Sequence, residues 1–228
     1  MCGRYILTAA PEAVAKAFGY RDAAWFPPRH NIAPSQPIGI VRHVRRTREF
    51  ALVRWGLIPG WAKDPRRFTL LVNARAEGLA GKAAFRGPLQ YRRCLVPATG
   101  YYQWQRGGAG PPEPWLVCRR DGGLIGFAGL WEAWMGSDGS EIDTACIITT
   151  RANSTLAPLG DRMPAIIPLE RWGDWLDSDH NAAAAAVTLL RPAEEAALAA
   201  FRVGMAVNSA GNDDPSLVAL LPAAGPGC

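Results

Sequence analysis

The chain has 228 residues, 49% of them hydrophobic, which is enough to bury one sizeable core in a single domain spanning residues 1–228. Twenty-five Lys and Arg residues against 20 Asp and Glu residues give a net charge of +5, which favours a polyanionic partner. No run of eighteen apolar residues is present, and the start lacks a basic segment followed by an apolar one. We therefore expect a cytoplasmic protein with no membrane association.

The cysteine and histidine content argues against a metal site and against a disulfide framework. The five cysteines form no CxxC pair, and the chain has only three histidines. We expect no cofactor. Cys94, Cys118 and Cys146 lie in apolar, strand-like surroundings, which predicts that they pack in the core.

The chain starts Met1-Cys2-Gly3-Arg4-Tyr5. A methionine before a residue as small as cysteine is a substrate for removal, which would leave Cys2 with a free α-amine beside its thiol. Such an aminothiol condenses with an aldehyde to a Schiff base, and the thiol then closes a thiazolidine ring. An α-amine titrates near ~7.7–8.0, so part of it is nucleophilic at neutral pH. The alternative is that Cys2 is an ordinary second residue.

The first half of the chain mixes helix and strand signals. Residues 11–19 predict a short helix with proline in its first turn and Gly19 at its end. Prolines within 25–34 predict an irregular segment. Residues 38–41 and 50–55 predict strands that flank a basic turn at 42–48, and residues 77–85 predict a helix.

The second half begins with apolar runs separated by glycine-rich turns, a pattern typical of antiparallel sheet. Helices are predicted over 169–176, 182–190 and 193–201, and a last strand over 205–208. These patterns favour an α+β fold. The predicted strands cover residues 94–97, 101–105, 115–119, 124–134 and 144–150, with turns at 107–112, 121–123 and 136–139.

Two stretches carry residues suited to nucleic acid. Trp61 follows a Pro-Gly turn and precedes Lys63, Arg66 and Arg67; an exposed aromatic beside cations suits single strands, although Trp61 can equally be a core residue. Asn73 can cap a helix or orient a reacting carbonyl, and Arg75 can bind a phosphate.

Taken in order, the short segments resemble the SOS response-associated peptidase family, the abasic-site processing proteins. The resemblance extends from Met1 to about Leu217 and is specific, because chance would not keep so many segments in order. The segments are Cys2–Tyr5, Asn31–Pro34, Trp55–Pro59, Asn73–Glu77, Arg93–Ala98, Ala128–Glu132, Ile148–Thr150, Asp161–Pro164 and Ala206–Asn208.

The resemblance implies a barrel-like core of antiparallel and mixed sheets with peripheral helices. It also implies a protein, expected to be monomeric, that removes Met1 and binds single-stranded DNA. Cys2 would capture the aldehyde of a ring-opened abasic site as a thiazolidine, which shields the lesion and associates the protein with the nucleoid. The family name records a peptidase activity, which we expect to act on the protein's own Met1.

Carried over by position, the family's nucleophile falls on Cys2 and its active-site asparagine on Asn73. The phosphate-binding arginines fall on Arg4, Arg75 and Arg162, and Trp61 is the expected stacking residue. Two further catalytic positions depart from the family.

Gln103 stands where the family has glutamate, and Gly160 stands where it has histidine. Neither residue can exchange a proton, and general acid–base help is worth ~10²–10⁴ in rate. An aminothiol still condenses with an aldehyde without them, so an impaired crosslinking protein is expected. The alternatives are a noncatalytic single-strand-binding relative and a peptidase limited to self-processing.

Overall fold

The computed structural model describes residues 2–221, with the exception of 23, 46, 106–109 and 181. Twelve strands and four α-helices occur in this described part of the chain. The strands are β1 (Tyr5–Leu7), β2 (Arg29–Ile32), β3 (Pro37–Val44), β4 (Thr47–Trp55), β5 (Asn73–Arg75), β6 (Arg93–Ala98), β7 (Gly100–Gln105), β8 (Glu113–Arg119), β9 (Ile125–Met135), β10 (Glu141–Arg151), β11 (Arg162–Pro164) and β12 (Leu198–Arg202). The α-helices are α1 (Pro11–Phe18), α2 (Ala83–Tyr91), α3 (Trp172–Leu176) and α4 (Ala183–Val187).

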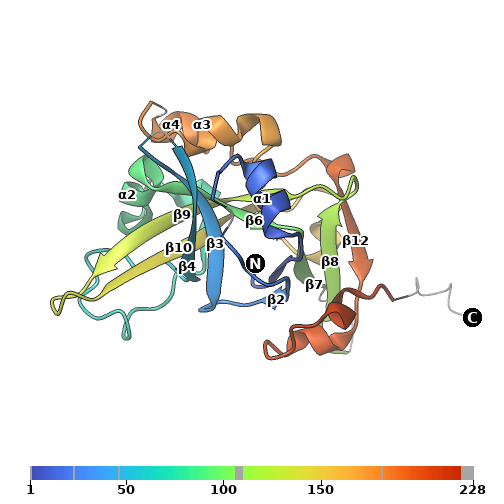
Figure 1. The fold of residues 1–228 in the computed structure, drawn as a ribbon. Coiled ribbons are helices and arrows are strands. Elements are labelled where there is room, and N and C mark those ends of the chain that lie inside the picture. The colour runs from blue at the N-terminus through green and yellow to red at the C-terminus, as the bar shows by residue number, and fades with distance from the viewer. Residues whose placement is uncertain (1, 23, 46, 106–109, 181, 222–228) are drawn as a thin grey trace, which may run out of the picture.

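Five strands close into a barrel, in the order β4, β3, β6, β9 and β10 (Figure 1). Strand β10 closes it, because it pairs antiparallel with β9 and parallel with β4. Alternating apolar residues along these strands fill the interior, where Trp55 and Phe127 are fully buried. Strands β5 and β11 also pair with β10, so they extend the barrel wall.

A second sheet, in the order β12-β8-β7-β1-β2, carries the start of the chain. In Figure 1 the N-terminal end of the chain lies between the barrel strands and strands β7 and β8. Tyr5 joins the two parts, since its ring lies edge-on to Trp55 of β4 at 5.4 Å and to Phe127 of β9 at 6.0 Å. The first described residues are thus held at the junction of sheet and barrel.

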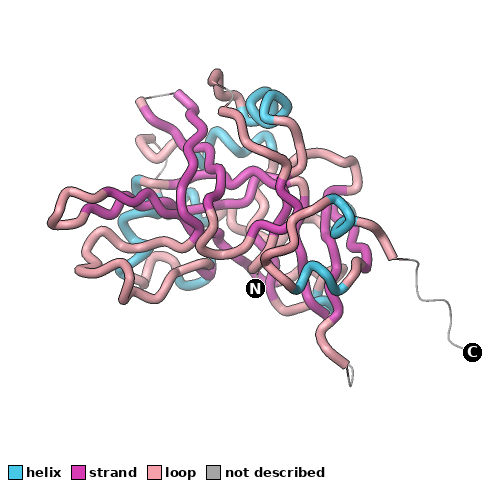
Figure 2. The backbone as a smooth tube through the Cα atoms, turned by 60° about the horizontal axis from the view of Figure 1, so that its bottom comes forward, coloured by secondary structure: helices cyan, strands magenta, loops and turns pink. Residues whose placement is uncertain are grey.

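The helices lie outside the sheets (Figure 2). Helix α1 buries Val14, Ala15 and Phe18 on one face, and Phe18 stacks on Trp172 of α3 with ring centroids 4.1 Å apart. This arrangement confirms the predicted α+β fold with a barrel-like core and peripheral helices. Among the described residues, every helix is too short or too polar to span a bilayer.

Several local predictions were wrong. The helix predicted over 77–85 is a 3-10 turn, η1 (Ala76–Gly78), followed by α2 from Ala83, because Gly78 and Gly81 weaken a continuous helix. Residues 198–202 form strand β12. The alanine-rich sequence favours a helix there, but pairing with β8 satisfies the backbone N–H and C=O groups in a strand. Residues 205–208 form a 3-10 turn, η5, in place of a strand. The supposedly irregular segment contains β2, and the basic turn consists mainly of the ends of β3 and β4.

The predicted helix at 11–19 and the predicted barrel strands are confirmed. Part of the predicted turn at 107–112 lies outside the described residues. Cys94 and Cys146 are fully buried, as predicted, whereas Cys118 is only half-buried.

Candidate active site and nucleic-acid cleft

Cys2 is held between strands β5 and β7. The side-chain Nδ2 of Asn73, the first residue of β5, donates a hydrogen bond of 2.7 Å to the carbonyl oxygen of Cys2. On the other side, β1 runs antiparallel to β7, and the backbone N–H of Tyr102 donates to the carbonyl oxygen of Arg4 at 3.0 Å. Asn73 therefore orients the backbone of Cys2 and does not cap the following turn.

The side chain of Cys2 is fully buried. Loss of hydration raises the pKa of the Cys2 thiol to about 12, although the charge of the chain's α-amino group and the backbone N–H of Arg4 oppose the shift. The thiol is therefore protonated at neutral pH. Nearby, the Oδ1 of Asn73 is buried and has no hydrogen-bond partner among the described residues.

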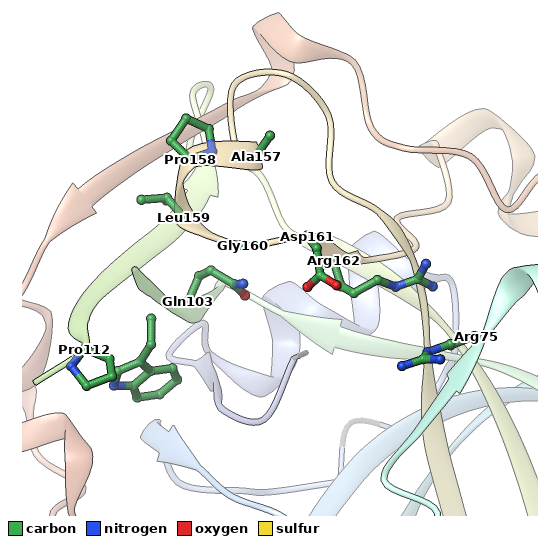
Figure 3. Close-up of a pocket in the computed structure, with 10 residues that line it drawn as sticks. Arg75, Gln103, Pro112, Ala157, Pro158, Leu159, Gly160, Asp161 and Arg162 are labelled. Atoms are coloured by element: carbon green, nitrogen blue, oxygen red, sulfur yellow. The ribbon is translucent and has the colours of Figure 1, made fainter. Parts of the chain in front are cut away.

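A cleft of about 760 Å³ opens beside this region (Figure 3). Pro112 lies toward one end and Arg75 toward the other, with Gln103 between them. Asn73 and Arg75 are two residues apart on β5, so their side chains share a face and connect Cys2 to the cleft. Cys2 itself does not line the cleft. The lining residues are Arg75, Gln103, Trp104, Pro112 and residues 157–162.

Gln103 and Gly160 lie against each other in this cleft. A Cβ built on Gly160 would lie 2.2 Å from the Nε2 of Gln103. The backbone of Gly160 is extended, with φ 163°, so its geometry suits any residue and only the position of Gln103 opposes a side chain. Gln103 is 6% exposed, and its Oε1 has no hydrogen-bond partner in the described structure.

Two of the arginines predicted to bind phosphate have protein partners. Arg162 donates to both carboxylate oxygens of Glu77, at 2.7 and 2.9 Å, and to the carbonyl oxygen of Thr149 at 2.6 Å. These side-chain hydrogen bonds from Arg162 lower the pKa of Glu77. Arg162 thus lies in the cleft lining with its guanidinium already engaged.

Arg4 is engaged in the same way. Its guanidinium donates to Asn31 Oδ1 at 2.8 Å and to the carbonyl oxygens of Val207 and Asn208 at 2.7 and 3.2 Å. Asn31 in turn donates to three carbonyl oxygens between residues 207 and 212. Arg4 therefore ties the N-terminal strand to the C-terminal segment, and it does not line the cleft.

A smaller pocket of about 420 Å³ gathers Arg75, Arg151 and Arg162, together with Asp161. Strand register explains the grouping, because Thr149 of β10 pairs with Arg75 and Arg151 pairs with Arg162. Arg75 and Arg151 are both exposed. Sequence reasoning missed Arg151, although it directly follows the Ile148–Thr150 segment.

Trp61 is 62% exposed and lies outside both pockets. Its ring is edge-on to Phe68 at 5.7 Å, and the cations Lys63, Arg66 and Arg67, which follow it in the sequence, are exposed. Of the two alternatives that the sequence left open for Trp61, the structure shows the exposed one, whereas Trp55 is fully buried. No cluster of three His, Cys, Asp or Glu side chains able to hold a metal occurs in the part of the chain that the structure describes.

The model of the SOS response associated peptidase (SRAP) family matches residues 1–210. The chain belongs to this family. A relative, the abasic site processing protein YoqW of Bacillus subtilis, is 34% identical over 221 residues, which cover 96% of this chain and 99% of that protein. The abasic site processing protein HMCES of Gallus gallus is 31% identical, over 94% of this chain and 76% of its own length.

Solved structures agree with this membership in the SRAP family. A protein from Bacteroides thetaiotaomicron matches with a TM-score of 0.85 at 27% identity, over 96% of this chain and all of that chain. A protein from Bordetella bronchiseptica matches with a TM-score of 0.78 at 26% identity, over 90% of this chain and all of that chain. The barrel and the second sheet therefore belong to a fold that these solved structures share.

Proposed function

We propose that this protein processes abasic sites in single-stranded DNA by forming a covalent bond from Cys2 after removal of Met1. The observation that carries the proposal is the hydrogen bond from Asn73 Nδ2 to the carbonyl oxygen of Cys2 at 2.7 Å. It fixes the reactive end of the chain beside the strand that carries Arg75, an exposed cation of the cleft. Relatives named abasic site processing proteins support the same substrate.

The reaction follows from the two groups on Cys2. The α-amine attacks the aldehyde carbon of the opened sugar, and water leaves as a C=N bond forms. The sulfur then adds to that carbon and the thiol proton passes to nitrogen, which closes the thiazolidine with one water lost overall. The amine is the first nucleophile, because an α-amine titrates near ~7.7–8.0 and is therefore partly uncharged at neutral pH. The buried Cys2 must become accessible from the cleft, and we expect removal of Met1 to allow this.

The phosphates of the strand are expected to lie along the arginines of the cleft. Arg75 and Arg151 are exposed at one edge of the barrel wall, and they are the first contacts that a phosphate would meet. Arg162 would bind phosphate only by exchanging its bonds to Glu77, whereas Arg4 positions the N-terminal strand. Trp61 offers a separate aromatic surface on which a base can stack.

A second candidate is a noncatalytic single-strand-binding protein, and the Gln103–Gly160 pair favours it. Neither residue can act as general acid or base, so each of the two family positions that would move protons is inert. The chemistry proposed above then proceeds without that help and is expected to be slower by ~10²–10⁴.

A denaturing gel distinguishes the two candidates. The purified protein, with Met1 removal verified by intact mass, is mixed with a single strand whose uracil has been excised. The crosslinking proposal predicts a slowly formed band that survives detergent, is absent with Cys2→Ala and persists with Cys118→Ala, a half-buried cysteine away from the cleft. Salt-sensitive binding with no band over many hours would instead establish the noncatalytic role.

A further inference from the structure

We propose that Asp213 is a positioning residue for the thiol of Cys2, on which the second bond of the crosslink depends. The inference rests on the proposed function, because the step that Asp213 governs is closure of the thiazolidine ring. It goes beyond that function by assigning control of the thiol to the C-terminal segment, residues 205–214, none of which lines the cleft. In Figure 1 this segment lies next to β2, whose backbone it contacts.

Asp213 anchors β2 to the C-terminal segment. Its Oδ1 accepts from the backbone N–H groups of His30 and Asn31, the latter at 2.9 Å, and its Oδ2 accepts from the Nε of Arg29. Hydrogen bonds to an ionised carboxylate are roughly twice as strong as bonds between neutral groups. The side chains of Asp213 and Arg29 are only 23% and 28% exposed, so solvent screens their ion pair incompletely. Asp213 therefore fixes the backbone that carries Asn31.

The side chain of Asn31 connects this anchor to Arg4. It is fully buried, and its Nδ2 donates to three carbonyl oxygens between residues 207 and 212, at 2.8–3.2 Å. Its Oδ1 accepts from the Nη1 of Arg4 at 2.8 Å, and the same guanidinium donates to the carbonyl oxygen of Val207 at 2.7 Å. Asn31 and the C-terminal segment thus hold the Arg4 guanidinium together, and Asp213 holds Asn31 against that segment.

The backbone of Arg4 contacts the reactive residue. Its N–H forms a hydrogen bond to the thiol of Cys2, and that bond opposes the rise in the pKa of the thiol. Its carbonyl oxygen accepts from the N–H of Tyr102 in β7 at 3.0 Å. Hydrogen bonds and the Arg4 side chain therefore form a continuous connection from Asp213 to the sulfur of Cys2.

Ring closure is the step that this connection should affect most. The Schiff base forms at the α-amine. The sulfur then adds to the imine carbon, the C=N bond becomes a single bond, and the thiol proton passes to nitrogen. Because the N–H of Arg4 holds the sulfur, a displacement of Arg4 changes the distance over which the sulfur must attack, and a misplacement of about 1 Å can lower a rate ~10²-fold. Loss of Asp213 should therefore slow closure more than it slows formation of the Schiff base.

Chemical trapping measures the two steps separately. Protein lacking Met1 is incubated with a single strand that contains one abasic site, and samples are treated with borohydride at successive times. Borohydride reduces a Schiff base to a secondary amine and leaves a thiazolidine intact, so the two products on the Cys2 peptide differ in mass by two hydrogen atoms. For the wild-type protein we expect mainly thiazolidine. For Asp213→Ala we expect the trapped amine to increase about tenfold at early times.

Asp214→Ala is the matched control. Asp214 follows Asp213 directly, but its carboxylate accepts from the N–H and Oγ of Ser216 and caps the 3-10 turn η6 (Pro215–Val218), without a hydrogen bond to β2 among the described residues. The variant loses the same charge and a cap, so it should lose stability without a change in the trapped fraction. Asp213→Asn keeps one oxygen for the two backbone N–H groups but loses the ion pair with Arg29, so its trapped fraction should rise about threefold.

An equal trapped fraction in wild type and Asp213→Ala, both folded by circular dichroism, would overturn the inference, and so would an equal rise in Asp213→Ala and Asp214→Ala. If Asp213→Ala fails to fold, Asp213→Asn decides, and a fraction equal to that of wild type overturns the inference. The same trapping with formaldehyde in place of DNA separates this inference from the proposed function. If no variant reacts with DNA but formaldehyde reproduces the expected order of trapped fractions, only the proposed function is refuted.

Discussion

The amide of Gln103 occupies the space in which a side chain at position 160 would begin, with its Nε2 2.2 Å from the Cβ that Gly160 lacks (Figure 3). The two residues come from β7 and from the turn before β11, and nothing but the fold brings them together. A side chain introduced at position 160 alone would therefore contact the amide of Gln103. The pair has to be regarded as one feature of the cleft.

Gly160→Ala should be tolerated. The atom it meets is the tip of a flexible side chain that can rotate into the open cleft, and alanine restricts the unfolded chain. We expect the free energy of unfolding to change by ~1 kcal/mol or less. Gly100→Ala is the matched control, because its Cβ would meet the backbone oxygen of Val117 at 2.8 Å and should cost ~1–3 kcal/mol. Urea denaturation measures the free energy of unfolding of both variants. If Gly160→Ala lost as much stability as Gly100→Ala, the side chain of Gln103 would be shown to be unable to move.

Gln103→Glu combined with Gly160→His should speed the crosslink. The two changes introduce the residues expected from the family resemblance, both of which exchange protons, and such groups contribute ~10²–10⁴ in rate. Gly160→His alone should gain less, since Gln103 still occupies the adjacent space. Single-turnover gel assays measure the rates. An unchanged rate in the double variant would mean that these positions do not take part in the reaction.

Arg75→Ala and Arg151→Ala should each weaken single-strand binding and reduce the slope of log affinity against log salt by ~0.7, the value expected for one lost phosphate contact on a single strand. Both side chains are exposed in the pocket that also contains Arg162. Arg120→Ala removes the same charge from an exposed position outside both pockets and should leave the slope unchanged. Identical slopes in all three variants would exclude a phosphate track at this edge.

Alkaline pH should destabilise the fold. Burial raises the pKa of the Cys146 thiol from 9.0 to about 12, and it also raises the pKa of Tyr101 well above its usual value. A raised pKa means that the folded state retains the proton up to a higher pH than the unfolded state does. The stabilisation of the fold by these groups is therefore complete below pH 9 and is lost as the pH rises toward 12. Thermal unfolding between pH 8 and pH 11 should show a falling Tm. A flat Tm across that range would contradict the burial of these groups.

Local patterns predicted much of the fold. Apolar runs between glycine-rich turns located β6 to β10, and proline and glycine bracketed α1. Barrel closure was not predictable, because β10 pairs in parallel with β4, which lies far earlier in the sequence. Residues 198–202 were mistaken for helix because alanine propensity is local, whereas the free edge of β8 is a tertiary feature.

For the site, residue type singled out Cys2 and Asn73, whereas only the resemblance to the family indicated Gln103 and Gly160. The structure places Asn73 against Cys2 and Gln103 against Gly160, which sequence spacing does not reveal. The partners of Arg4 and Arg162 were equally hidden, because Asn31 and Glu77 come from distant segments. Whether an arginine is free for phosphate thus depends on tertiary contacts.

The most direct test of the account is the mass of the covalent product, with the linked residue located by fragmentation. Protein lacking Met1 is incubated with a single strand that contains one abasic site, and the product is digested. We predict a product whose mass is that of protein plus DNA less one water, with the link on the peptide that begins at Cys2. A product linked through a lysine, or a link on a chain that retains Met1, would contradict thiazolidine formation at Cys2.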